Sequence, residues 1–231
     1  MPVHNWTKEY AWLFHDFHHE WLSALSRTLN GGLLPNDHYA LIERWNGAFE
    51  RDFPPRDEDD NDANPFVVVD TAPRSEVPTK PVCLVTVRRE PDDAVVAACE
   101  VCLPDYHTGE VAWLTVAERA GALISDGIHL FLVNVHLPPP QTDYPHAAVW
   151  NRLGFAAVPF ESDRQVTLAS YEAVAPPKAY VEPVAVGDVL PDMPLFLVPG
   201  GHVLVPLEAT YLAAWEGVPI QGRKLLNAGA S

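Results

Sequence analysis

The segments AVVAACEV (94–101), EVAWLTVAERAGALISDG (110–127) and HLFLVNVH (129–136) decide the fold of this 231-residue chain. The first and third are short apolar runs typical of buried strands. The middle segment repeats its apolar residues at helical spacing and ends on a glycine. A strand, a crossover helix and a second strand usually lie parallel and right-handed in one sheet. The pattern therefore predicts an α/β fold, with Glu100 at the carboxyl end of the first strand, where such sheets bind ligands.

Three further segments before this unit have the composition of strands. VCLVTVRR (82–89) is separated from residues 94–101 by EPDD (90–93), a spacing that predicts an antiparallel hairpin with a four-residue loop. HYALIERW (38–45) and PFVVVD (65–70) are the other two predicted strands.

The first 30 residues predict an amphipathic helix, which ends at Asn30-Gly31-Gly32. Its apolar face consists of Phe14, Phe17, Trp21, Ala24, Leu25 and Thr28. Near its start, His15 and His19 are one turn apart and could hold a divalent metal ion, with Asp16 beside them. The alternative interpretation is an exposed polar first turn, in which Asp16 interacts favourably with the helix dipole.

The carboxyl-terminal third is rich in proline. HAAVWNRL (146–153) predicts a short helix, and QVTLASYEA (165–173) predicts a strand. Residues 175–201 are expected to run extended over a surface rather than to fold alone. LEATYLAAWEG (207–217) predicts a closing helix. We expect a single domain, with a core at about 35–175 and a carboxyl-terminal arm and helix at 176–231 packed on it.

The formal net charge of −16 at pH 7 restricts the class of partner. Nucleic-acid binding depends on lysine and arginine neutralising phosphates, and the chain has only four lysines. We therefore expect a protein partner rather than nucleic acid. The acidic run RDEDDND (56–62) lacks the glycine and the distant glutamate of a calcium-binding loop, so a solvated loop is the preferred interpretation.

The sequence predicts a soluble, cytoplasmic protein without membrane association. No apolar run approaches the length of a transmembrane helix, and the amino terminus lacks the apolar region of a signal peptide. Three cysteines do not make a disulfide framework, which agrees with a reducing compartment.

Two carboxylates on predicted strands are candidates for chemistry. Glu100 lies in an otherwise apolar strand, where a carboxylate is costly unless it is paired or binds a metal. A strand-end residue that faces solvent is the alternative interpretation. Glu43 lies on the predicted strand 38–45 and is the second candidate. His107 and His129 are candidate acid–base groups, although a lone histidine is more often structural.

The remaining motifs favour structural roles. Cys99 and Cys102 form a CxxC, but Cys99 lies inside a strand, and Pro104 separates Cys102 from the helix. Both are therefore interpreted as small buried apolar residues. The chain has no GxSxG, P-loop or GxGxxG motif, which removes support for a serine hydrolase or a nucleotide-binding protein.

Several segments resemble a bacterial family of proteins of unknown function, DUF 4058. They are WLFHDFHHEWLSALSRTLN, HYALIERW, ACEVCLP, SDGIHLFLVNVHLPPP, KAYVEPVAVGDVLPDMPLFL and VPLEATYLAAWE, in family order over most of the chain. That family is similar in its central strand-loop-helix-strand to the Uma-type PD-(D/E)XK nuclease-like proteins. The resemblance implies a restriction-endonuclease-like α/β core, a mixed sheet flanked by helices. In that fold, acidic residues and a lysine hold a divalent metal that activates water.

The resemblance also implies that this site is degenerate. The strand-end glutamate of the family falls on Glu100, and a second family glutamate falls on Glu43. The lysine that follows falls on His107, and the metal-binding aspartate falls near Pro65-Phe66, where the chain has no aspartate. A later Val-Glu-Ile-Asp pattern is replaced by residues 131–134, Phe-Leu-Val-Asn.

Two functions follow as hypotheses. The first is a non-catalytic binding or interaction module with a degenerate PD-(D/E)XK-like site, no cofactor, a protein partner and an unassigned oligomeric state. The second is a phosphodiesterase or nuclease dependent on magnesium or manganese, in which Glu43, Glu100 and Asp70 bind the metal and Glu100 and His107 are catalytic. A metal-binding protein using His15, Asp16 and His19 is a third, weaker hypothesis.

Overall fold

A computed structural model of the chain describes residues 3–6, 11–47, 82–103, 110–136, 145–156, 164 and 166–228. The elements in chain order are α1 (Ala11–Thr28), the π-helical turn η2 (Leu29–Leu33), β1 (His38–Trp45), β2 (Val82–Arg89), β3 (Ala94–Val101), α2 (Glu110–Ser125), β4 (His129–Asn134), α3 (Pro145–Leu153), β5 (Val166–Glu172), β6 (Lys178–Val184), β7 (Asp192–Val198), β8 (Gly201–Pro206), α4 (Leu207–Gly217) and α5 (Ile220–Ala228). The strand expected at 65–70 and the acidic run at 56–62 lie outside the described residues.

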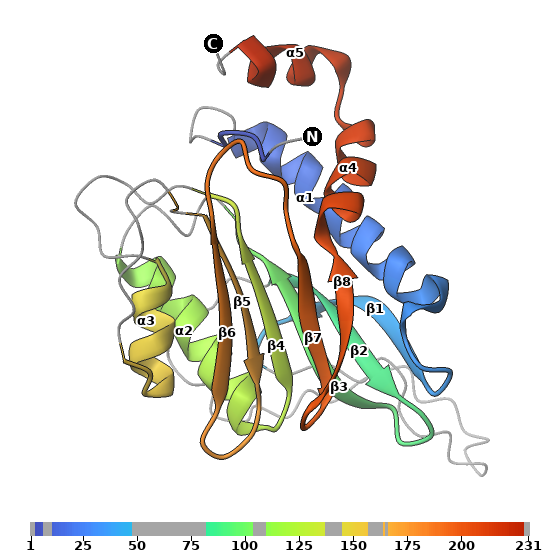
Figure 1. The fold of residues 1–231 in the computed structure, drawn as a ribbon, viewed down its shortest axis with the longest axis vertical. Helices are drawn as coiled ribbons and strands as arrows, with labels where there is room; N and C mark the ends of the chain where they lie inside the picture. The colour runs from blue at the N-terminus through green and yellow to red at the C-terminus, as the bar shows by residue number, and fades with distance from the viewer. Residues whose placement is uncertain are drawn as a thin grey trace, which may run out of the picture.

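The described strands form a six-stranded mixed sheet in the order β1-β2-β3-β4-β5-β6 and a separate two-stranded sheet of β7 and β8 (Figure 1). Within the large sheet β3 and β4 are parallel, and every other neighbouring pair is antiparallel. The helix α2 connects the parallel pair, and the β2–β3 hairpin precedes it. The mixed α/β architecture and the predicted strand-helix-strand unit are therefore confirmed.

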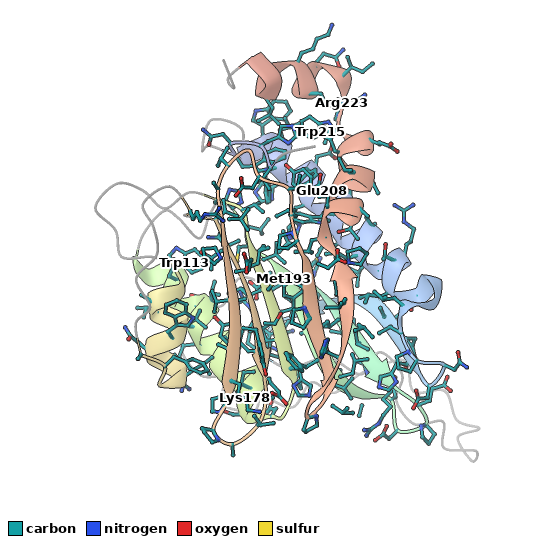
Figure 2. The ribbon with its side chains drawn as sticks, viewed as in Figure 1. Trp113, Lys178, Met193, Glu208, Trp215 and Arg223 are labelled. Atoms are coloured by element: carbon teal, nitrogen blue, oxygen red, sulfur yellow. The ribbon has the colours of Figure 1, made fainter. Side chains whose placement is uncertain are left out.

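One face of the large sheet is covered by α1, α4 and the β7–β8 hairpin (Figure 1). Apolar side chains from all of these elements pack into one core with the sheet, and Met193 of β7 is among them (Figure 2). The helices α1 and α4 are also joined by a buried hydrogen bond, in which Trp21 Nε1 donates to Thr210 Oγ1 over 3.0 Å. This layer buries alternate residues of the central strands.

The opposite face is covered by α2 and α3. Its core includes Trp113 of α2 (Figure 2) and Trp150 of α3, packed against Leu130 and Leu132 of β4. Because helices cover one face of β4 and the β7–β8 hairpin covers the other, every residue of β4 is buried. The near-continuous apolar composition of this strand follows from that position.

The amphipathic face expected for the first helix is confirmed in α1. Phe14, Phe17, Trp21 and Leu25 are each at most 1% exposed. The chain turns after α1 at Gly32, whose φ of +106° lies in the left-handed region that glycine adopts without strain. Among the described residues, no helix is both long enough and apolar enough to span a bilayer.

The segment 175–201 is extended, as expected, but its strands belong to the two sheets. β6 pairs with β5 along its whole length, and β7 pairs with β8. β6 is the sixth strand of the main sheet and begins close to the boundary expected between the core and the carboxyl-terminal arm at 176–231. Pro183 lies within β6, an edge strand, where a missing N–H is tolerated. The closing helix is confirmed as α4, and α5 follows it without having been predicted.

Candidate functional site

Glu100 lies near the end of β3 and faces α2. Its carboxylate accepts two hydrogen bonds from the guanidinium of Arg119 on α2: Nε donates to Oε2 over 2.8 Å, and Nη2 donates to Oε1. Both side chains are only 1% exposed. The ring centre of Trp45 lies 5.6 Å from Cζ of Arg119, within the range of a cation–π interaction. The candidate catalytic carboxylate is therefore held in a buried, bidentate ion pair.

Apolar residues flank Glu100 on both neighbouring strands. Leu132 of β4 is its partner in the parallel ladder. In the antiparallel ladder Val85 pairs with Cys99, so the next step places Leu84 opposite Glu100. Leu84 and Leu132 are both fully buried. The surroundings of Glu100 are therefore a dry core in which Arg119 provides the compensating charge.

Glu43 of β1 lies in the same cross-strand row, because it pairs with Leu84. Two strand spacings, about 10 Å, separate it from Glu100 on the same face of the sheet. Glu43 has its own arginine: Arg88 Nε donates to Oε2 over 3.1 Å, and Nη2 donates to Oε1 over 2.8 Å. Thr86 also donates to Glu43 Oε2. The structure thus places the two glutamates on one face and gives each a separate guanidinium.

Arg88 also ties this row to the turn after β2. Its Nη1 donates to the Asp93 carbonyl over 2.8 Å and lies 3.1 Å from Asp93 Oδ2. The Glu43 carboxylate raises the pKa of the Arg88 guanidinium, which keeps it charged. Tyr39 of β1 donates a hydrogen bond to Asp93 as well. These contacts fix the hairpin against β1 and use the polar atoms of Glu43 in structure.

The other two members of the expected phosphodiesterase site, His107 and Asp70, lie outside the described residues. Within the described residues, no group of three or more His, Cys, Asp or Glu side chains is arranged to hold a metal ion. The convergence of Glu43 and Glu100 with further ligands therefore stays a prediction.

The histidines of α1 have different environments. Asp16 and His19 are exposed, and His15 is half-buried. His18, which was not singled out from the sequence, is 2% exposed, and its Nε2 lies 3.0 Å from the carbonyl oxygen of Val101 at the end of β3. Burial, together with a smaller effect of the neighbouring histidines, lowers the pKa of His18 to about 4. His18 is thus a neutral residue that connects α1 to β3.

The three cysteines are free thiols. Cys99 is packed in the core beneath α1, and Cys102 is packed in the core beneath α2. Burial raises the pKa of both thiols, with the Glu100 carboxylate adding to the shift. The interpretation of Cys99 and Cys102 as small buried apolar residues is confirmed.

Asn134 occupies the position where the resemblance expects an acid. It is fully buried at the end of β4, and its side chain brackets His136: Oδ1 accepts from the His136 N–H over 3.2 Å, and Nδ2 lies 3.3 Å from the His136 carbonyl oxygen. His129 at the start of β4 accepts a hydrogen bond from the Ala173 N–H over 3.0 Å, and burial lowers its pKa. The side chains of Asn134 and His129 thus both bond backbone groups of the fold.

Arg119, the partner of Glu100, was not predicted as a site residue, although the sequence contains a signal for it. Arg119 lies between Val116 and Ala120 on the buried face of α2, where an arginine needs an anionic partner. His18 lies on the apolar face of α1 between Phe14 and Trp21 and was missed in the same way.

Comparison of the chain with protein-family models, with curated proteins and with solved structures found no match.

Proposed function

We propose that this chain is a non-catalytic binding or interaction module with a restriction-endonuclease-like core, in which an arginine occupies the place of a catalytic metal ion. The observation that carries the proposal is the bidentate pair of Glu100 and Arg119, buried beneath Trp45. Glu100 lies at the strand end where the resemblance expects a metal ligand. Its charge is instead compensated by a residue of the chain.

The geometry of the pair opposes metal binding at Glu100. A metal ligand needs an accessible oxygen lone pair about 2.0–2.5 Å from the ion. Each oxygen of Glu100 already accepts a hydrogen bond from Arg119. A cation at this position would have to displace the guanidinium and leave it buried without compensation, which costs several kcal/mol (about 3–5).

A divalent-metal-dependent phosphodiesterase is the second candidate. The observation in its favour is that Glu43 and Glu100 occupy one cross-strand row on one face. It requires Arg88 and Arg119 both to leave their carboxylates, and it requires His107 and Asp70 to complete the site. The formal charge of −16 further disfavours a nucleic-acid substrate, so we propose a protein partner.

Calorimetric titration with Mn²⁺ and with Mg²⁺ distinguishes the two functions. The proteins to compare are wild type, Glu100→Gln and Glu118→Gln, a control on the exposed side of the same helix. The proposed module gives the same heats for all three proteins. A stoichiometric site that is present in wild type and Glu118→Gln but lost in a folded Glu100→Gln would overturn the proposal and support the phosphodiesterase.

A further inference from the structure

β1 is the outermost of the described strands on one side of the large sheet. Backbone groups of successive residues on a strand point alternately toward one neighbour and the other. At Ala40 they point outward, because both are bonded by the side chain of Asn30: Ala40 N–H donates to Oδ1 over 2.8 Å, and Nδ2 donates to the Ala40 carbonyl over 2.9 Å. The backbone groups of Ile42 and Arg44 therefore also point outward.

On this edge, the Asn30 side chain bonds the backbone groups of Ala40 only. No described residue forms a hydrogen bond with the outward N–H and C=O groups of Ile42 and Arg44. The neighbouring side chains Leu41 and Ile42 are 43% and 44% exposed, on opposite faces of the strand. The segment from Leu41 to Trp45 thus combines backbone groups that no described residue bonds with exposed apolar side chains, the two features that allow strand addition.

The opposite edge of the sheet has features that oppose pairing. β6 presents Lys178 and Glu182 to solvent and contains Pro183. Charged side chains and proline are the usual means by which an edge strand avoids pairing with another chain. The edge at β1 has no proline, and two of its exposed side chains are apolar. The two edges of one sheet therefore differ in their capacity to accept a further strand.

We propose that the outer edge of β1, from Leu41 to Trp45, binds an extended segment of a partner protein by strand addition, and that the Asn30 side chain ends the pairing at Ala40. The proposal deepens the binding function proposed above and rests on it. Main-chain hydrogen bonds to Ile42 and Arg44 would provide the affinity, and contacts with Leu41 and Ile42 on the two faces would select apolar residues in the partner.

The charge of the chain indicates the chemistry of the partner. Two copies of a chain with net charge −16 repel each other, whereas a basic segment is attracted. The edge itself adds no large barrier to a basic segment, because Arg44 is its only exposed cation among residues 41–45. The proposed partner segment is therefore extended, basic, and apolar at adjacent positions that face the two sides of the sheet.

A peptide with the sequence of residues 82–89, in which serine replaces Cys83, is a suitable probe. It carries Arg88 and Arg89, and its alternation of side chains matches β1, which it pairs with in the native sheet. Binding of the fluorescein-labelled peptide is measured by anisotropy with wild type, Ile42→Lys, Arg44→Pro and the control Leu204→Ala. Leu204 is an exposed apolar residue on β8, in the separate two-stranded sheet. Proline at 44 removes an outward N–H without breaking the ladder with β2.

We expect Ile42→Lys and Arg44→Pro each to weaken peptide binding about ten-fold or more, which is the loss of one or two interactions. Leu204→Ala should bind as wild type. In hydrogen exchange, the amides of Ile42 and Arg44 should exchange faster than those of Leu41 and Glu43, and the peptide should slow them. Circular dichroism checks that each variant is folded. If Arg44→Pro unfolds, the loss of binding in Ile42→Lys alone tests the proposal.

Three outcomes of the peptide-binding and hydrogen-exchange experiments would overturn the proposal. They are absence of peptide binding at millimolar concentration, binding that neither edge variant weakens, and protection of the Ile42 and Arg44 amides in the protein alone. A dimer by light scattering that Ile42→Lys dissociates would also overturn it, since the occupant would then be a second copy. None of these results depends on Mn²⁺. Failure of the strand-addition proposal can therefore be distinguished from failure of the non-catalytic function, which the metal titration tests.

Discussion

Replacing Arg119 by methionine tests whether the buried carboxylate of Glu100 depends on its arginine. In Arg119→Met the carboxylate stays between Leu84 and Leu132 and loses both charge-assisted hydrogen bonds. The double variant Glu100→Met/Arg119→Met removes both charges and leaves two flexible apolar side chains in their place. Comparison of the two variants separates the effect of an unpaired charge from the effect of altered packing.

The expected magnitudes follow from the burial of the pair. Both side chains are 1% exposed, so solvent screening is minimal. Removing one partner of such a pair costs about 3–5 kcal/mol, whereas replacing both by apolar residues is neutral or stabilising by about 1–4 kcal/mol. For a chain of this size 1 kcal/mol changes the Tm by about 2–4 °C, so Arg119→Met should melt about 6–20 °C below wild type. The double variant should melt at or above the wild-type temperature.

Urea unfolding followed by tryptophan fluorescence at pH 7 gives the free energies, and circular dichroism gives the Tm values. Glu118→Gln is the matched control, because its ion pair with Arg152 is solvent-exposed and should contribute less than about 1 kcal/mol. An Arg119→Met protein as stable as wild type would refute the reasoning, since Glu100 would then not need the guanidinium. A double variant as unstable as the single one would show that packing, rather than charge, determines the effect.

Three other predictions follow from named contacts. The pKa of His18 is about 4 in the folded chain and 6.5 in the unfolded chain, so its contribution to stability is complete above pH 6.5 and is lost as pH falls toward 4. Urea unfolding at pH 7 and 4.5 should show that His18→Gln removes up to about 3 kcal/mol of this dependence; an unchanged slope would contradict it. An aromatic disulfide reagent at pH 8 should modify only Cys83 rapidly and should modify Cys99 and Cys102 only after unfolding, because both are buried; rapid reaction of all three in the folded protein would show that the core opens. Asn30→Ala should lower the free energy of unfolding by about 1–2 kcal/mol, because two hydrogen bonds to Ala40 are lost, and an unchanged urea midpoint would indicate that water replaces them without cost.

The sequence predicts the centre of the fold better than its edges. The strands β3 and β4 are buried on both faces, so their apolar runs and the helical period of α2 are strong local signals. β6 was missed as a strand because it lies at the edge, where side chains alternate between exposed and half-buried and a proline is tolerated. β8 pairs with β7 across a turn at Gly200, and β7 packs on β3 and β4, which are distant in sequence.

At the candidate site too, the sequence predicts local features better than contacts between distant residues. Sequence reasoning identified Glu100 as a carboxylate that burial would make costly unless it had a partner, and the structure provides that partner. What the sequence could not supply is the pairing itself, because Glu100 and Arg119 are brought together by the crossing of α2 over the sheet. The same applies to Glu43 and Arg88, whose proximity depends on the register of β1 with β2.

Both glutamate–arginine pairs are connected to β1, the strand whose outer edge we propose to bind a partner. Glu43 of β1 accepts hydrogen bonds from Arg88, and Trp45 of β1 lies against Arg119. Each negative charge in this row is balanced by an arginine, so the row needs no external cation and contributes nothing to the net charge of −16. The long-range attraction of a basic partner therefore comes from other parts of the chain, while the two pairs hold β1 in place. It follows that Arg88→Met should weaken peptide binding at the edge by disordering β1, whereas added Mn²⁺ should leave it unchanged.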